Sequence, residues 1–115
     1  MKHVRTGIVG VDQGSETLFS DFEDGGSMWT GTGTREVRHP VRFGEAFAEA
    51  PAVMVGISMW DIDQQSNQRA DISAASITPE GFDIVFRTWS DTRVARIRAS
   101  WIAIGALPDD EVWDL

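Results

Sequence analysis

Hydrophobic and polar residues alternate along several short segments of this chain, and clusters of turn-forming residues separate those segments. Alternation with a period of two residues is typical of β-strands that bury one face in a core. The pattern therefore predicts an all-β fold, and its six strands suit a sandwich. The predicted strands are Val4–Asp12, Arg35–Phe43, Ala52–Asp61, Arg69–Thr78, Gly81–Trp89 and Arg93–Gly105.

Two segments between these strands do not alternate. Gly14–Gly33 is rich in Gly, Ser, Thr and acidic residues, which predicts a long loop with at most a short strand at Thr17–Phe19. Gly44–Ala50 is the helical candidate, and Pro51 would end that helix after about two turns.

The turn at Thr78–Gly81 sets a register for the two strands that it joins. Pro at its second position and Gly at its fourth are typical of a type I turn. Closing this turn pairs Ala75 with Ile84 and, further along, Arg69 with Ser90. The fourth and fifth predicted strands should therefore form a hairpin.

A two-residue loop at Asp91–Thr92 predicts a second hairpin between the last two strands. Its register pairs Phe86 with Ile97 on the apolar face and Arg87 with Arg96 on the other face. Like charges directly opposite each other destabilise a sheet, so Asp83 or carboxylates of another subunit would have to relieve them. The arginine-bearing face therefore favours oligomerisation.

The two hairpins together bring Arg69 and Trp89 to one end of the sheet, beside the polar loop Ser90–Thr92. A guanidinium donates hydrogen bonds to pairs of hydroxyls, and an indole packs against the C–H face of a pyranose. This combination suits a sugar site. The same two side chains suit a cation–π or intermolecular contact equally well, and their spacing does not separate these interpretations.

The composition narrows the range of partners. The chain has 115 residues, 42% of them hydrophobic, and a net charge of -8, which fits one ordinary domain. We place this domain at residues 1–105 and an acidic C-terminal tail, which contains Trp113, at residues 106–115. The acidity lies mainly at the two ends. Nonspecific binding to nucleic acid or to anionic membranes is not expected.

The sequence contains no apolar run of a signal peptide or of a transmembrane helix. We therefore expect no membrane insertion, and a protein that is cytoplasmic, non-classically secreted or associated with a particle. The absence of cysteine excludes disulfides and thiolate metal sites.

Candidates for metal binding and catalysis are weak. Asp61 and Asp63 superficially offer a metal-binding pair, but the loop lacks the glycine and glutamate of an EF-hand, which favours a turn-capping aspartate. His39 lies on the same face of its predicted strand as Val37 and Val41, which favours a packed structural histidine. No nucleophile, base and orienting group converge, so we predict no enzyme, no metal and no cofactor.

Several segments occur in an order and spacing that match one known family. They are Pro51–Asp61, Ser66–Arg69, Gly81–Phe82, Thr88–Thr92 and Ser100–Gly105, with Arg5–Gly7 and Thr34–Glu36 also fitting. Over about residues 4–105, the chain resembles the H-type lectin domain of snail agglutinins and discoidins.

The resemblance implies a carbohydrate-binding lectin, for which we expect a role in cell adhesion. It implies a six-stranded antiparallel β-sandwich, a homotrimer, and galactose or N-acetylgalactosamine bound in clefts between subunits. In the family, the arginine that matches Arg69 contacts sugar hydroxyls, and the tryptophan that matches Trp89 lines the pocket. These are the two residues that the hairpin registers brought together.

The chain also departs from the family at three positions. The acidic sugar ligand of the family falls near Thr32, the histidine after the tryptophan is Ser90, and a later aromatic residue aligns with Ala95. The predicted ligand-binding residues are Arg69, Trp89, Ser90, Asp91 and Thr32. A different glycan stays open, as does a degenerate site kept only for assembly. The alternative function is a structural, adhesion or receptor-binding component of a phage-like particle or surface assembly that uses the fold without sugar.

Overall fold

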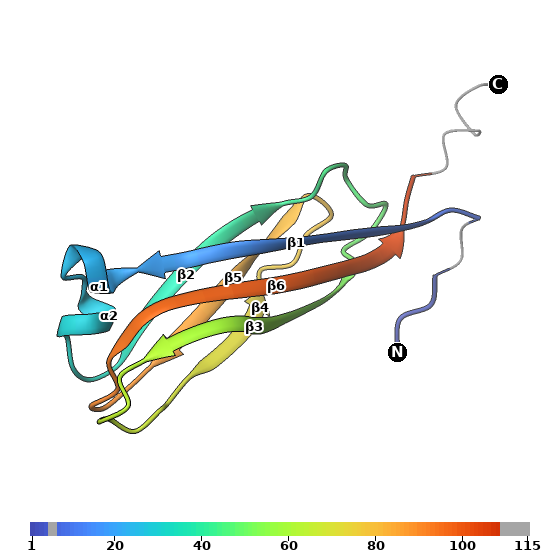
Figure 1. The fold of residues 1–115 in the computed structure, drawn as a ribbon. Coiled ribbons are helices and arrows are strands. Elements are labelled where there is room, and N and C mark those ends of the chain that lie inside the picture. Colours follow the sequence, from blue (N-terminus) through green and yellow to red (C-terminus); the bar gives the residue numbers. More distant parts are fainter. Residues whose placement is uncertain (5–6, 109–115) are drawn as a thin grey trace.

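Two three-stranded antiparallel sheets pack face to face in this protein (Figure 1). The computed structural model describes residues 1–4 and 7–108. One sheet has the order β1-β6-β3 and the other the order β2-β5-β4. The strands are β1 (Val9–Ser20), β2 (Arg35–Arg42), β3 (Ala52–Ile62), β4 (Asp71–Ala75), β5 (Gly81–Thr88) and β6 (Val94–Ala106), with short helices α1 (Asp21–Asp24) and α2 (Ser27–Thr30).

The predicted six-stranded antiparallel β-sandwich is confirmed, and its core lies between the inner faces of the sheets. Side chains of β5 and β6 fill its centre because alternate residues of both strands point inward. The core contains an aromatic group in which Phe82 contacts Trp101 at a ring distance of 5.4 Å and Phe43 at 5.8 Å. The buried apolar residues of β5 and β6 include Phe82, Ile84, Phe86, Val94, Ile97, Ala99, Trp101 and Ala103.

The long loop predicted at Gly14–Gly33 is wrong, although the short strand expected at Thr17–Phe19 lies within β1. The first predicted strand, Val4–Asp12, is a strand only from Val9 onward, and its residues 5 and 6 lie outside the described residues. Strand β1 runs on to Ser20 and is followed by α1 and α2. Gly14 belongs to the strand because it lies opposite Trp101, whose indole covers it; a Cβ there would come within 2.8 Å of the indole ring. The glycine is therefore a packing requirement of the sheet and not a sign of a loop.

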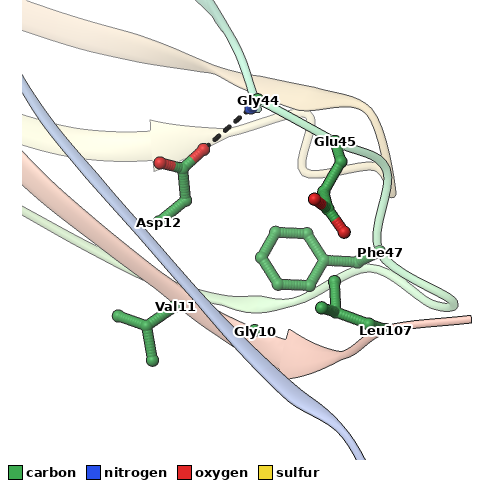
Figure 2. Close-up of a pocket in the computed structure, with 7 residues that line it drawn as sticks. All are labelled: Gly10, Val11, Asp12, Gly44, Glu45, Phe47 and Leu107. Atoms are coloured by element: carbon green, nitrogen blue, oxygen red, sulfur yellow. Dashed lines mark hydrogen bonds between the residues drawn. The ribbon is translucent and has the colours of Figure 1, made fainter.

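The helix predicted at Gly44–Ala50 is also wrong. The N–H groups of this segment donate to other elements. Gly44 donates to the Asp12 carboxylate at 2.9 Å (Figure 2), and Phe47 donates to the Pro79 carbonyl at 2.9 Å. The ring of Phe47 is buried in the core. Tertiary hydrogen bonds and burial thus replace the local hydrogen bonds of a helix.

The β4–β5 hairpin exists, but its register differs by one residue from the prediction. Ala74, rather than Ala75, lies opposite Ile84, and Ile72 lies opposite Phe86. The extra residue is taken up near Ser76, whose φ is 52°. In this register Ile72 and Ala74 face the core together with the apolar residues of β5 that lie opposite them. The burial of these two side chains explains why the observed register is preferred to the predicted one.

The second predicted hairpin is wrong, because β5 and β6 belong to different sheets. The apolar side chains of these two strands face each other across the core and do not lie side by side. Arg87 and Arg96 consequently lie on opposite outer faces of the sandwich. The guanidinium of Arg87 forms ion pairs with the carboxylates of Asp71 at 3.7 Å and Glu36 at 3.9 Å. The guanidinium of Arg96 forms an ion pair with the Asp61 carboxylate at 3.0 Å.

Candidate functional site

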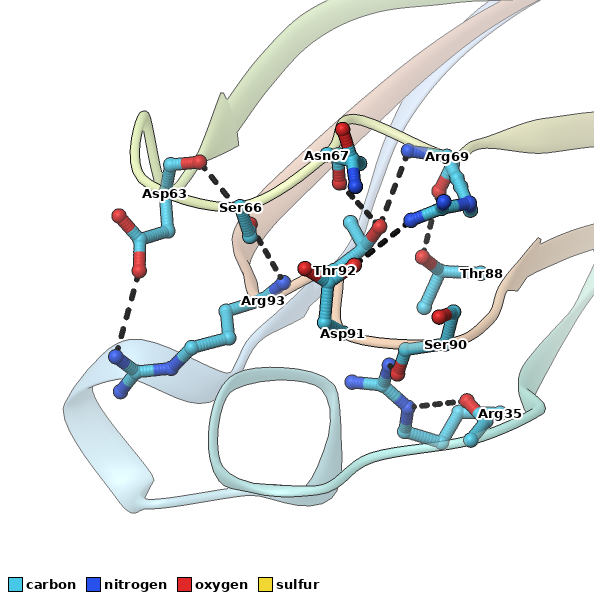
Figure 3. Close-up of polar contacts among 11 residues, drawn as sticks. Arg35, Asp63, Ser66, Asn67, Arg69, Thr88, Ser90, Asp91, Thr92 and Arg93 are labelled. Atoms are coloured by element: carbon cyan, nitrogen blue, oxygen red, sulfur yellow. Dashed lines mark hydrogen bonds and ion pairs between the residues drawn. The ribbon is translucent and has the colours of Figure 1, made fainter.

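The loop between β5 and β6 and the segment before β4 meet at one end of the sandwich (Figure 3). Arg69 is held there in three ways. Its Nη1 lies 2.7 Å from Oδ1 of Asp91, its backbone N–H donates to the Thr92 hydroxyl at 3.2 Å, and its carbonyl accepts from the Thr88 hydroxyl. The expected proximity of Arg69 to the loop at Ser90–Thr92 is therefore present, although the predicted strand pairing that led to it is partly wrong.

The fixed point of this arrangement is Thr92, which is fully buried. Its hydroxyl donates to the Asn67 carbonyl and accepts from the Arg69 backbone. One threonine thus joins both segments and uses its hydroxyl as donor and acceptor at once. The backbone on which the Arg69 and Asp91 side chains sit is correspondingly well fixed.

Trp89 follows the last residue of β5 and lies outside the core, as the alternation predicted. Its side chain is exposed and lines a hollow of about 360 Å³. Thr34, Ala70, Asp71 and Arg87 line the same hollow. The hollow therefore combines an indole surface with a hydroxyl, a carboxylate and a guanidinium.

The segment that contains Thr32 is tied to the same loop. The Gly33 N–H donates to the Ser90 carbonyl at 2.9 Å, and Thr32 is exposed immediately before it. Ser90 has a φ of 63°, a left-handed conformation that is uncommon for a residue with a side chain. The structure thus brings Thr32 and Ser90 to the end that also holds Arg69, Trp89 and Asp91.

Sequence reasoning missed Arg35 as a functional residue. This arginine is 9% exposed, and its guanidinium donates only to backbone carbonyls of three neighbouring segments. The acceptors are Gly33 at 2.9 Å, Ser27 at 3.4 Å, Met28 at 3.2 Å and Ser90 at 3.3 Å.

Arg35 therefore fixes the Ser90 peptide against α2 and the start of β2. A signal for it was present in the sequence. Arg35 occupies a position of β2 with the same parity as Val37 and Val41, where a charged residue has to be accommodated inside.

The weak metal and catalytic candidates have structural partners. Asp63 accepts a hydrogen bond from the Gln65 N–H at 2.9 Å, the turn-capping role expected of it. His39 is half-buried, with its Nε2 3.4 Å from the Glu16 carboxylate across the edge of the sandwich. Within residues 1–4 and 7–108, no three metal-ligating side chains form a group that could hold an ion.

A second hollow, of about 190 Å³, lies at the opposite end of the sandwich, between β1 and the segment after β2 (Figure 2). Asp12, Glu45, Phe47 and Leu107 are among the residues that line it. It contains none of the predicted site residues. The candidate site is therefore the end at which the β5–β6 loop, the Thr32 segment and the start of β4 converge.

Comparison with known proteins gives consistent results. A sequence model described as the H-type lectin domain matches residues 38–104. The chain is 62% identical over 107 residues to ATP synthase subunits region ORF 7 of Fuscovulum blasticum, with 93% of each chain covered. It is 40% identical over 81 residues to discoidin-1 of Dictyostelium discoideum, a match that covers 70% of this chain and 32% of that protein.

The solved structure of recombinant discoidin II of Dictyostelium discoideum superimposes with a TM-score of 0.74 at 25% identity. The match covers 86% of this chain and 38% of that one. The chain thus spans about a third of the length of the discoidins that it matches. Both helices in the part of the chain that the structure describes are far too short to cross a bilayer.

Proposed function

Because the chain belongs to the H-type lectin domain family, we propose that it binds glycans at the end of the sandwich that carries Arg69 and Trp89. Ser90, Asp91 and Thr32 surround these two residues in the proposed site. The observation that carries the proposal is the fixed Arg69 side chain, whose guanidinium lies 2.7 Å from Asp91 on a backbone held by two threonines.

This arrangement suits hydroxyl recognition. A guanidinium has five N–H donors, and the contact with Asp91 leaves others to donate to a pair of hydroxyls. A side chain that is already oriented loses less conformational entropy when it binds. The indole of Trp89 then offers the apolar surface against which the C–H face of a pyranose packs.

The charges of the proposed site favour a neutral glycan. The carboxylate of Asp91 balances Arg69, and Asp71 lies 3.7 Å from Arg87. An anionic sugar would have to compete with these carboxylates. Galactose and N-acetylgalactosamine are the first ligands to test. Thr32 carries no carboxylate, so Asp71 and Asp91 would be the carboxylates that accept hydrogen bonds from the sugar hydroxyls.

We further propose that the chain acts as a homotrimer with its sugar clefts between neighbouring subunits. The outer face of the β1-β6-β3 sheet supports this assembly. Val11 is 62% exposed and Met54 is 72% exposed on that face. Exposed apolar patches of this kind mark contact surfaces. We call Val9, Val11, Met54, Ile102 and Ile104 the apolar face, and propose that a second copy of the chain covers it.

The three sugar sites of one trimer would make binding multivalent. A shallow site for one sugar binds weakly, and linked sites raise the effective concentration of the second and third contacts. This consequence fits a role in cell adhesion, which we include in the proposal.

A glycan array probed with the intact chain and with Arg69→Ala tests the site. Loss of charge-assisted hydrogen bonds to the sugar is expected to weaken binding by about 10- to 100-fold. Arg38→Ala is the matched control, since Arg38 is an exposed arginine that pairs with Asp83 on the outer face of β2 and β5. It should bind as the unchanged chain does.

An unchanged array signal for Arg69→Ala would contradict the proposed site. No glycan signal from a correctly assembled chain would favour the alternative, a structural or receptor-binding component of a particle or surface assembly. Sedimentation of the same sample shows whether assembly is intact.

A further inference from the structure

The two short helices carry an exposed aromatic surface at the same end of the sandwich as the proposed sugar site. Phe22 is 59% exposed, and its ring meets Trp29 edge to face at 5.2 Å. The guanidinium of Arg93 lies over the Trp29 ring, 4.2 Å from its centre. We call Phe22, Trp29 and Arg93 the cap platform.

The cap platform is fixed in place. Nε of Arg93 donates to the Trp29 carbonyl at 3.0 Å, and its Nη1 lies 3.4 Å from Asp63. The Met28 N–H donates to the Asp21 carboxylate at 2.9 Å, and the Met28 side chain is buried in the core. The exposed ring of Phe22 is therefore presented by a well-held segment, at little entropic cost to a ligand that packs on it.

The cap platform and the proposed sugar site share the loop between β5 and β6. Arg93 follows Asp91 by two residues, so their Cα atoms are at most about 7.6 Å apart. Arg35 links the two places a second time, because its guanidinium donates to carbonyls of α2 and to the Ser90 carbonyl. Figure 3 shows the Arg93 side chain extending from this loop toward the helices.

We propose that the cap platform is a second subsite, which binds the next residue of a neutral oligosaccharide whose first residue occupies the site at Arg69 and Trp89. The inference rests on the proposed function. A pyranose has an apolar C–H face that packs on an aromatic ring and hydroxyls that accept from a guanidinium, which Phe22 and Arg93 provide together. Asp63 balances the charge of Arg93, so an uncharged sugar is favoured here too.

The test compares short and long glycans with Phe22→Ala. The probes are galactose and N-acetylgalactosamine, each as the monosaccharide and at the end of di- and trisaccharides. Because Phe22 contacts only the second residue, Phe22→Ala should leave monosaccharide affinity unchanged and weaken oligosaccharide binding about three- to tenfold. Glu23→Ala, an exposed change in the same helix, is the matched control and should alter neither.

The outcomes separate this inference from the proposed function. No binding of any probe by the unchanged chain overturns both. Normal oligosaccharide binding by Phe22→Ala overturns the subsite alone, and so does an equal loss of mono- and oligosaccharide binding. A change of sedimentation coefficient in Phe22→Ala also overturns it, because the ring would then be a contact between subunits.

Discussion

The two outer faces of the sandwich differ in chemistry although the same alternation produces both. On the β2-β5-β4 face, Arg87 lies between Glu36 and Asp71, and Arg38 pairs with Asp83. The β1-β6-β3 face is apolar toward the end of β6, where Val11, Ile104 and Ala52 form one row and Gln13, Ile102 and Met54 the next.

The comparison shows what alternation leaves undecided. Both inner faces must be apolar because they meet in one core, but an outer face is constrained only by what covers it. The paired charges on the outer face of the β2-β5-β4 sheet are suited to contact with water. Apolar rows suit another copy of the chain, with the paired Arg96 and Asp61 marking the polar end of the same sheet. The following experiments test this difference, beginning with the largest expected effect.

A charge placed on the apolar face should abolish assembly. Met54→Arg would bury an unpaired guanidinium in the proposed contact between copies, at a cost that exceeds what a shallow interface provides. We expect the mass in sedimentation equilibrium to fall from trimer to monomer while the circular dichroism spectrum stays unchanged.

Ser73→Arg is the control for this change, because it adds the same charge to the outer face of β4. It should remain trimeric. If Met54→Arg and Ser73→Arg had the same oligomeric mass in sedimentation equilibrium, the two outer faces would not differ in the way that we propose.

Removal of Arg35 tests a charged residue that the fold turns inward. Arg35→Met keeps an unbranched apolar side chain in place of the aliphatic part of the arginine, but it leaves four carbonyl acceptors without their donor. We expect the free energy of unfolding in urea to fall by roughly 3 kcal/mol. Sugar affinity should fall as well, because the Ser90 peptide loses its support. A loss below about 1 kcal/mol would show that water replaces the guanidinium.

A side chain at Gly14 tests the inner face of the β1-β6-β3 sheet. Gly14→Leu would collide with the indole of Trp101, since even a Cβ comes within 2.8 Å of it. We expect a loss of about 1–3 kcal/mol in thermal or urea unfolding.

Gly56→Ala provides the comparison on the outer face of the same sheet, where a Cβ would meet nothing within 4 Å. Its stability should be unchanged or slightly raised. Equal losses in the two variants would point to backbone flexibility and not to the indole contact.

The smallest effect is expected from the paired charges of the other outer face. Asp83→Ala removes the partner of Arg38, an exposed pair separated by 3.6 Å. Exposed pairs contribute less than about 1 kcal/mol, and salt screens them. We expect a small change in the free energy of unfolding that disappears at high salt, and no change in mass.

Part of the candidate site could be predicted from sequence. Alternation placed Trp89 outside the core, and the turn at Thr78–Gly81 brought Arg69 near Ser90, with an error of one residue in the register. That error was tolerable because the hydroxyls of Thr88 and Thr92 hold the Arg69 backbone near the loop. The role of Arg35 was not predicted, since its acceptors are carbonyls of segments that are far apart in the sequence.

The sequence by itself determined which residues of β5 and β6 face the core, because an apolar residue at every second position has to leave water whichever strand lies beside it. It also determined the hairpin at Thr78–Gly81, whose turn is local. Only the tertiary structure decided that β5 and β6 lie in opposite sheets. Alternation specifies a buried face and not a neighbour, so side-by-side pairing and packing across a core give the same pattern.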